Sequence, residues 1–434
     1  MKRKGHIIEE ITEYGNLYES LRYVLRGRVG ETQEGRRLLD NAEAVVASLQ
    51  QEIGAGTYHI SEYHEFKVDE RGKERTIQSV PLRDRIALNA IMKVLEKHLN
   101  PSFVTDSAAS IKGRGGHYLF KRMVDAIQSD PQGTCFVYKW DYRHYYQSIP
   151  QDKMFDVLKR KFKDPRLLRI MWGVIHTLKE GLSIGFRSSQ VLGNLYLDYY
   201  IDHRLKDEMA VKYYFRYCDD GVVLAGSYKE LTRIIRKIHE FSDTAALTIK
   251  GNEQVWELRN RNIDFLGFVY HASGQIKVRK HIKKRFARRW KRVIGYDRKV
   301  KLIGAFYGMA KHADARHLFN KITGYDMTRF SELGLGGLTK EGKKMFETQT
   351  YTLTALNGID ITLLDFETHI KTQHGEERCV VYFTSAELGE GKFFTSCGQM
   401  ISQLEQMRER GVFPVETTIK RINYGGNKYK FIFT

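Results

Sequence analysis

The segment YYFRYCDDGVVLAGS at residues 213–227 constrains this chain more than any other part of its sequence. Two apolar runs flank an acidic pair, Asp219 and Asp220, and this pattern predicts a β-hairpin with both carboxylates at its tip. A second apolar stretch, TCFVYKWD at 134–141, predicts a strand that ends in Asp141. Because a sheet holds the ends of its strands rigidly, these three residues form a candidate set of metal ligands.

Such a set suits nucleotidyl transfer to a primer hydroxyl, which two Mg²⁺ ions can catalyse by activating the attacking oxygen and stabilising the leaving pyrophosphate. Neighbouring residues at a hairpin tip point to opposite faces, so we expect Asp219 to bind both ions with Asp141, and Asp220 to support them. Mn²⁺ is an alternative ion. The competing interpretation is an Asp pair in an ordinary turn, because Asp is common in turns.

Charge supports a phosphate-rich partner. The chain has 71 Lys+Arg against 52 Asp+Glu, a net charge of +19. Residues 352–434 carry nine Lys/Arg and ten Asp/Glu, so the first 351 residues hold a net +20. A protein that neutralises nucleic-acid phosphates needs this excess, whereas an enzyme of small molecules rarely does. A basic but inert surface is the alternative.

Other classes of protein are disfavoured. The four cysteines form no CxxC pair, which argues against a zinc knuckle and a disulfide framework. The N-terminus MKRKGHIIEE lacks a following apolar run, and no segment approaches membrane-spanning length. We therefore expect a protein of the bacterial cytoplasm that binds no membrane.

Hydrophobic periodicity predicts an α+β chain with a separate C-terminal part. Helices are expected at these positions: 10–54, 82–98, 151–163, 186–209, 229–243 and 276–319. Strands are expected at 55–80, 134–141, near 247–250 and at 263–270, besides the acidic hairpin. A Gly-rich linker follows at 331–351. Short alternating strands, a helix at 398–410 and an Asn-Tyr-Gly-Gly turn fill residues 352–434.

These motifs make the chain resemble reverse transcriptases. YCDD at 217–220 resembles their Y-x-D-D box, and KWDYRHYYQSI at 139–149 resembles their first catalytic motif, an Asp followed five residues later by an aromatic. Tyr146 is that aromatic, and its ring would close the floor under the sugar and so select deoxynucleotides. A plain core aromatic is the alternative for Tyr146. The resemblance also implies that Tyr142 and Gln190 contact the incoming nucleotide.

Further matches follow in the order of the family. KERTIQSVPLRDRI at 73–86 and DSAASIKGRGGHYLFKRM at 106–123 resemble the fingers motifs of group II intron enzymes. The resemblance implies that Arg75 meets the triphosphate and that Lys112 and Arg114 meet template phosphates. A solvated hairpin charge is the alternative for Arg75.

Two further segments resemble parts of the family that contact the primer. NIDFLGF at 262–268 resembles the primer grip, which assigns Phe265, Leu266 and Gly267 to the primer 3′ end. Residues 302–322 resemble the helical thumb. The preceding segment, 277–292, contains many basic residues and no acid, so we expect it to track a nucleic-acid backbone. The residues chosen from it are Lys283, Lys284, Arg288 and Arg289.

One motif narrows the family. Group II intron and retron enzymes carry Q-G-x-x-x-S-P, whereas IGFRSSQ here gives I-G-x-x-x-S-Q, with Ile184, Gly185, Ser189 and Gln190. This form resembles the reverse transcriptases of diversity-generating retroelements. It implies an error-prone enzyme that copies a dedicated template RNA into cDNA, with dNTPs as substrates. A structured non-coding RNA and a small basic accessory protein are the implied partners.

There are also departures from the family. Glu253 stands where the family has a lysine that serves as a general acid, and Lys250 is near but out of register. No RNase H or HNH pattern is visible in the C-terminal part. The role of Lys250 is therefore open at this stage, and we expect no template degradation by this chain.

The resemblance implies a right-hand polymerase with an extra domain. The expected parts are a helical extension at 1–54, fingers and palm at 55–275, an α-helical thumb at 276–330, a linker at 331–351 and a β-rich domain at 352–434. That last domain loosely resembles oligonucleotide-binding (OB) folds, and its aromatics suit stacking of single-stranded bases. Plain core aromatics, or a protein-docking module, are alternatives.

Three functions compete. The first is a mutagenic retroelement reverse transcriptase. The second is a related enzyme of antiphage defence that copies a non-coding RNA, and the genomic neighbourhood would separate these two. The third is a non-catalytic RNA-binding protein on a polymerase scaffold, against which the three aspartates argue.

Overall fold

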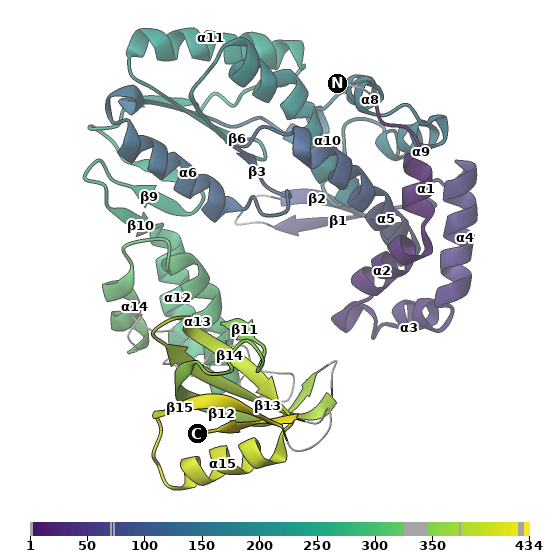
Figure 1. Cartoon of the computed structure of the whole chain (residues 1–434). Coiled ribbons are helices and arrows are strands. Elements are labelled where there is room, and N and C mark those ends of the chain that lie inside the picture. Colours follow the sequence, from purple (N-terminus) through teal and green to yellow (C-terminus); the bar gives the residue numbers. More distant parts are fainter. Residues whose placement is uncertain are drawn as a thin grey trace. The chain divides into compact units, whose positions relative to one another are not determined.

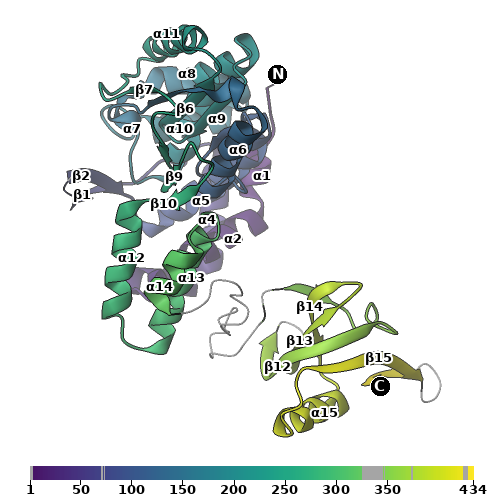
Figure 2. The same ribbon diagram turned by 90° about the vertical axis from the view of Figure 1, so that its left-hand side faces the viewer.

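The computed structural model describes residues 3–69, 72, 74–324, 346, 348–372, 375–423 and 429–434 (Figures 1 and 2). The chain forms two compact units, Met1–Arg279 and Lys280–Thr434. Most of the predicted linker and the Asn-Tyr-Gly-Gly turn lie outside the described residues. No helix in the described ranges has both the length and the apolar composition needed to cross a membrane.

A five-stranded sheet forms the centre of the first unit, with strand order β3-β5-β6-β4-β7. Its strands are β3 (Ser107–Ala108), β4 (Phe136–Trp140), β5 (Tyr213–Tyr217), β6 (Asp220–Ala225) and β7 (Gln254–Glu257). β5 and β6 form the predicted antiparallel hairpin, and β6 also pairs with β4, so that Trp140 faces Gly221. A Cβ atom at Gly221 would lie 2.3 Å from the Trp140 ring, so only glycine fits there. This pairing brings the end of β4 and the hairpin tip to one edge of the sheet.

Helices connect the strands of this sheet along the chain (Figure 1). They are α6 (Gly116–Ser129), α7 (Tyr145–Ser148), α8 (Gln151–Lys161), α9 (Pro165–Ile175), α10 (Arg187–Leu197) and α11 (Tyr228–Thr244). α11 packs on β4 and β6, and α6 packs on β5. The long helix predicted at 186–209 is α-helical only to Leu197, and it continues as π-helix over Asp198–Asp202 and Arg204–Glu208.

The N-terminal extension is helical, as predicted. Its helices are α1 (Ile7–Thr12), α2 (Tyr14–Val24), α3 (Gln33–Asp40) and α4 (Ala42–Ala55). They contact α5 (Leu82–Leu99), which is buried along most of its length and also packs on α10. Three short 3₁₀ segments connect elements: Gly27–Val29, Asn100–Ser102 and Gln132–Thr134.

Two small sheets flank the central one in sequence. β1 (His64–Asp69) and β2 (Glu74–Ser79) form an antiparallel hairpin, which is shorter than the strand region predicted at 55–80. β8 (Ile263–Phe265), β9 (Phe268–Tyr270) and β10 (Ile276–Val278) form a three-stranded sheet. The helix predicted from residue 276 was therefore wrong at its start, because β10 pairs with β9 before α12 begins.

The second unit starts with three helices, α12 (Lys280–Arg292), α13 (Tyr296–Ala310) and α14 (Arg316–Thr323). Phe286 of α12 is buried and stacks on Phe306 of α13, with ring centroids 3.9 Å apart. This contact sets the apolar side of α12, so its basic residues occupy the remaining faces.

A six-stranded sheet follows, in the order β11-β14-β13-β12-β15-β16. Its elements are β11 (Gln349–Tyr351), β12 (Asp360–Thr372), β13 (Gly375–Ser385), β14 (Gly389–Thr395), α15 (Gly398–Glu409), β15 (Val415–Asn423) and β16 (Tyr429–Phe433). β12, β13 and β14 form a meander, and β15 returns to pair with β12, which is a Greek-key arrangement.

This sheet curls into a half-barrel. The rings of Phe393 on β14 and Phe433 on β16 lie 6.5 Å apart, although the two strands are not neighbours in the sheet. Closure is incomplete, because β14 pairs with β11 rather than with β16. An OB-fold is a five-stranded, partly open Greek-key barrel, whereas this half-barrel has six strands, so the OB-like character of the domain remains a prediction.

Candidate active site

Asp141 and Asp219 come together at one edge of the central sheet. Asp141 follows the last residue of β4, and Asp219 lies in the two-residue turn between β5 and β6. Cys218, the first residue of that turn, has a left-handed backbone with φ 55°, which matches the primed turns of tight hairpins. Burial, and then the neighbouring Asp141 carboxyl, raise the pKa of Asp219 to about 7. Two carboxyl groups are thus held close in a partly desolvated place.

The residues fit a divalent cation. The Oδ1 atom of Asp141 is buried and has no hydrogen-bond partner in the described part of the chain. Carboxylate oxygens are the ligands that Mg²⁺ prefers, and a cation would relieve the repulsion between two adjacent carboxylates. Across the described residues, however, no three His, Cys, Asp or Glu side chains form a ready metal-binding group. The participation of Asp220 as a ligand therefore remains a prediction.

Positive charge surrounds these carboxylates. The ammonium of Lys250 forms an ion pair with Asp141, and its backbone N–H donates to the Asp141 carbonyl at 2.9 Å. Burial raises the pKa of Asp220, whereas the charges of Lys139, Lys250 and Arg279 oppose that rise. The three cations belong to β4, to the loop before β7 and to the residue after β10, so they converge from separate elements.

The sequence did not reveal these cations as part of the site. Lys250 appeared to be out of register, but a bridge between Tyr142 and Ile249 brings the chain back beside the end of β4. Glu253, at the position expected for the family lysine, instead accepts a hydrogen bond from Tyr138. The sequence feature that could have revealed Lys250 is its place directly after the apolar residues of the short LTIK segment, next to the bridge residue Ile249.

Tyr146 contacts the catalytic turn. Its hydroxyl lies 3.3 Å from the Sγ atom of Cys218, and a Cβ atom at Gly193 would lie 3.0 Å from its ring. The ring therefore lies between the turn and α10. Its predicted part in selecting deoxynucleotides remains a prediction.

The segment around Ile184 packs on the β1–β2 hairpin. A Cβ atom at Gly185 would lie 1.8 Å from the carbonyl oxygen of Gln78 on β2, and Ser183 donates to the Gln78 side chain at 3.1 Å. Farther along, Gln190 accepts a hydrogen bond from Ser110 at 3.1 Å. The I-G-x-x-x-S-Q motif thus joins β2 to the loop after β3.

The segment that carries these carboxylates is similar to a known protein family. Residues 66–270 match the family described as reverse transcriptase (RNA-dependent DNA polymerase). The chain contains a reverse transcriptase domain. That domain includes Asp141, Asp219 and all the residues found around them except Arg279. Residues 347–434 match a domain of unknown function, DUF8468. A comparison with curated proteins finds no match.

Solved structures of similar fold include two telomerases. Apo telomerase from Candida Tropicalis is 10% identical, with a TM-score of 0.43 over 56% of this chain and 51% of that one. Telomerase from Candida albicans, in complex with a TWJ fragment of telomeric RNA, is 10% identical, with a TM-score of 0.42 over 67% of this chain and 60% of that one. The chain thus spans between about half and three-fifths of these telomerase chains.

One predicted ligand contact of the reverse transcriptase domain needs correction, and a second residue has a structural contact. Tyr142 is only 1% exposed, and its hydroxyl lies 3.0 Å from Ser242 of α11, so it packs in the core and cannot contact a nucleotide. One terminal nitrogen of the half-buried Arg114 donates to the carbonyls of Phe103 and Val104 at 3.2 and 3.0 Å, so it braces the preceding loop, and its contact with a template phosphate remains a prediction.

The remaining fingers residues are exposed. Lys112 lies in the turn closed by the bridge between Ile111 and Arg114. Arg75 lies on β2 opposite Val68. The structure brings neither residue to the carboxylates, and their contacts with phosphate remain predictions.

The predicted primer grip lies beside the catalytic hairpin. Leu266 and Gly267 form its turn with φ values of 51° and 88°, and a Cβ atom at Gly116 would contact both Leu266 and Tyr217 at 3.8 Å. Phe265 is only 1% exposed and lies under Lys139, so it supports the hairpin rather than the primer. Leu266 and Gly267 remain the predicted primer contacts.

The predicted backbone contacts on α12 belong to the second unit. Lys284, Arg288 and Arg289 are exposed and Lys283 is half-buried. Their contact with a duplex remains a prediction.

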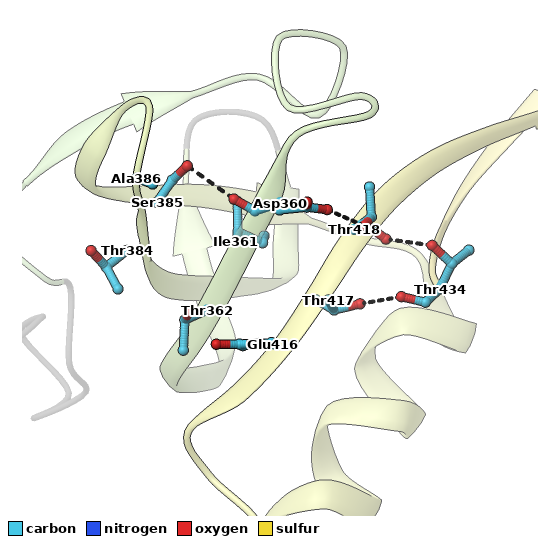
Figure 3. Close-up of a pocket in the computed structure, with 10 residues that line it drawn as sticks. All are labelled: Asp360, Ile361, Thr362, Thr384, Ser385, Ala386, Glu416, Thr417, Thr418 and Thr434. Carbon is cyan, nitrogen blue, oxygen red and sulfur yellow. Dashed lines mark hydrogen bonds between the residues drawn. The ribbon is translucent and has the colours of Figure 1, made fainter.

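A separate cavity lies in the C-terminal domain (Figure 3). It has a volume of about 590 Å³ and is lined by hydroxyls and two carboxylates, those of Asp360 and Glu416. Asp360 accepts a hydrogen bond from Thr418 at 2.5 Å, and Thr417 donates to the Thr434 carbonyl at 3.0 Å. Since its lining includes no basic residue, this cavity does not suit a polyanion.

Proposed function

We propose that this chain is an RNA-directed DNA polymerase that copies a dedicated template RNA into cDNA by Mg²⁺-dependent nucleotidyl transfer. The observation that carries the proposal is the meeting of Asp141 and Asp219 at one sheet edge within the reverse transcriptase domain. Bound Mg²⁺, or Mn²⁺ as an alternative, would activate the primer hydroxyl and stabilise charge on the leaving pyrophosphate.

The chain's own residues would then have distinct parts. Asp141 and Asp219 would hold the ions, and Asp220 would support them. Lys250 would keep the Asp141 carboxylate in position, since it bonds to both the side chain and the backbone of that residue. Tyr146, held between the turn and α10, would exclude a sugar that carries a 2′-hydroxyl.

We further propose the error-prone retroelement type. Ile184 stands where the group II intron and retron motif has a glutamine, and its neighbour Gly185 packs on β2 just before α10 begins. An apolar side chain there can hold a base pair only by shape, which would loosen discrimination between bases. An antiphage enzyme that copies a non-coding RNA is the alternative, because it would use the same carboxylates.

The test is primer extension on an RNA template with Mg²⁺ and four dNTPs, followed by sequencing of the products. Asp219→Asn should abolish synthesis, and Asp152→Asn, the same change at an exposed side chain of α8, should leave it intact. Errors concentrated opposite template adenine would support the retroelement type, whereas accurate copying would favour the defence role.

Template choice must be included in the design. The assay is run on a generic RNA and on the non-coding RNA encoded beside the gene, with the neighbouring accessory protein added. Equal activity of Asp219→Asn and the unchanged protein, or no synthesis in any arm, would refute the polymerase. RNA binding that survives Asp219→Asn without any synthesis would instead favour a non-catalytic scaffold.

A further inference from the structure

The near-neutral charge of the C-terminal domain conceals a strong separation. Residues 352–416 contain ten Asp/Glu and five Lys/Arg. Residues 417–434 contain no acid and four basic residues, Lys420, Arg421, Lys428 and Lys430. Of these four basic residues, Lys420 and Arg421 lie on β15 and Lys430 lies on β16.

The basic part of this hairpin extends beyond β12 as a two-stranded ribbon, which the bridge between Asn357 and Ile419 holds at its near end. β15 pairs with β12 only from Val415 to Thr418, whereas it pairs with β16 from Ile419 to Asn423. β16 lies at the edge of the sheet. We call the paired segments 419–423 and 429–433 the distal ribbon, which Figure 2 shows in yellow at the C-terminal end of the chain.

The distal ribbon exposes an aromatic ring together with cations. Tyr429 is 46% exposed, and the Arg421 guanidinium lies over its ring at 3.8 Å from the centroid. Lys420 and Lys430 occupy the other face, because they alternate with Arg421 and Tyr429 along the strands. Lys430 is fixed by a hydrogen bond to Gln399 of α15 at 3.0 Å.

The two ends of the hairpin differ in chemistry. Glu416, Thr417, Thr418 and Thr434 line the carboxylate- and hydroxyl-rich cavity at its base, where Asp360 adds a second negative charge (Figure 3). A polyanion would be repelled from the base and attracted to the distal ribbon. The charge separation thus favours binding of a phosphate-bearing partner at the distal ribbon rather than at the base of the hairpin.

We propose that the distal ribbon binds single-stranded nucleic acid, with a base stacked on Tyr429 and phosphates on Lys420, Arg421 and Lys430. An exposed aromatic ring needs an unstacked base, which a duplex hides and a single strand offers. Surface lysines are depleted at protein–protein interfaces, so a protein partner fits this set less well.

This proposal gives a ligand to a domain that is matched only to a family of unknown function. It does not depend on the polymerase activity, since a catalytically inactive chain should bind equally well.

The first experiment locates the contact by photo-crosslinking. The full chain carrying Asp219→Asn is mixed with a single-stranded RNA or DNA that contains 5-iodouridine, in the presence of excess blunt primer–template duplex to occupy the polymerase core. Irradiation and peptide mass spectrometry should place an adduct on Tyr429. Adducts confined to residues 1–323 would overturn the proposal.

The second experiment measures affinity in the same background by fluorescence anisotropy. Tyr429→Ala should weaken binding by roughly 5- to 100-fold, as expected for loss of one stacked base, and Tyr429→Phe should preserve it. Lys420→Ala/Lys430→Ala should reduce the slope of log affinity against log salt by about 1.4. The control is Lys371→Ala/Arg410→Ala, which removes two exposed cations elsewhere in the domain.

Thermal unfolding checks that all these variants fold alike. Equal losses of affinity in Lys420→Ala/Lys430→Ala and in the control Lys371→Ala/Arg410→Ala would show nonspecific electrostatic attraction and would overturn the proposal. A blunt duplex that binds as well as the single strand and ignores Tyr429→Ala would assign the ribbon to duplex backbone instead. No effect of any variant on nucleic acid would leave a protein partner as the better occupant.

Discussion

A buried ion pair beneath the catalytic turn allows the sharpest test of this structure. Arg216 is 2% exposed, and it donates to both carboxylate oxygens of Asp202, at 2.8 and 2.6 Å. Tyr214 also donates to Asp202 at 2.6 Å. The remaining nitrogen of Arg216 donates to Asn194 at 3.2 Å and to the carbonyl of Cys218 at 2.7 Å. The same guanidinium thus neutralises a buried acid and holds the turn that carries Asp219.

Replacing only one partner of this ion pair should strongly lower the free energy of unfolding. Asp202→Asn leaves an unpaired cation, and Arg216→Met leaves an unpaired carboxylate, in a place from which water is excluded. Removal of one partner of a buried pair costs about 3–5 kcal/mol. For a unit of this size that corresponds to a fall in Tm of roughly 6–15 °C.

Removing both partners separates stability from catalysis. Arg216→Met/Asp202→Leu leaves neither charge buried, so it should recover most of the lost Tm. It still lacks the donor to Cys218, so primer extension should stay well below that of the unchanged protein. The assays are thermal unfolding and primer extension on all four proteins. Single variants that lose less than about 1 kcal/mol, or a double variant no more stable than they are, would refute this account.

Three further predictions concern other contacts. Gly185→Ala places a Cβ atom 1.8 Å from a carbonyl oxygen of β2, so it should cost about 1–3 kcal/mol in thermal unfolding, whereas Gly173→Ala, with open space around it, should not destabilise. Lys250→Ala frees the Asp141 carboxylate and should lower the extension rate by up to about 100-fold, with Tm little changed. The Asp198 carboxylate, which lies 3.3 Å from the His203 ring, together with weaker effects, raises the pKa of His203 to about 9, above its unfolded value. The protonated ring therefore stabilises the fold fully below about pH 6.5, and this contribution, on the order of 1 kcal/mol at 38% exposure, is lost as pH rises through 9. The difference in Tm between the unchanged protein and His203→Gln should shrink over that range, and a constant difference would contradict the assignment.

The elements of the catalytic hairpin could be predicted from the sequence because their signals are local. Apolar runs on both sides of Asp219 and Asp220 specify two strands and a tight turn, whatever surrounds them. The strand before Asp141 was predicted for the same reason. Their meeting at one edge followed from the family pattern, and the pairing of β4 with β6 produces it.

Contacts between distant segments were the part that could not be predicted. A strand was expected near 247–250, but only a bridge forms there and β7 lies at Gln254–Glu257. The position of Lys250 depends on the bridge between Tyr142 and Ile249, whose two residues are far apart in sequence. Periodicity within a window carries no information about such a pairing.

A buried polar contact explains the error at Tyr142. Its hydroxyl suits a nucleotide contact, so the motif alone assigned it to the ligand. In the fold this hydroxyl instead lies in the core, 3.0 Å from Ser242. Side-chain chemistry alone does not distinguish a ligand contact from a structural hydrogen bond.

The crowding of carboxylates at the sheet edge leads to a final prediction about stability and metal. Burial and the neighbouring Asp141 raise the pKa of Asp219 to about 7, which means that its ionised form is destabilised by the fold. Asp219→Asn keeps the shape of the side chain and removes its charge. In the presence of EDTA the variant should therefore unfold at a higher temperature than the unchanged protein, with a free energy of unfolding larger by on the order of 1 kcal/mol.

Added Mg²⁺ should reverse this order. An ion that binds only the folded state raises the Tm of the unchanged protein, whereas the variant lacks a carboxylate to hold it. The measurement is Tm against Mg²⁺ concentration for both proteins, with Asp152→Asn as an exposed control. If Asp219→Asn were less stable than the unchanged protein in EDTA, repulsion between the carboxylates of Asp141 and Asp219 would not be destabilising the fold. If Mg²⁺ raised both proteins equally, the ion would bind elsewhere. Because the inactive variant is expected to be the more stable of the two without metal, the acidic pair is better explained by catalysis than by the needs of the fold.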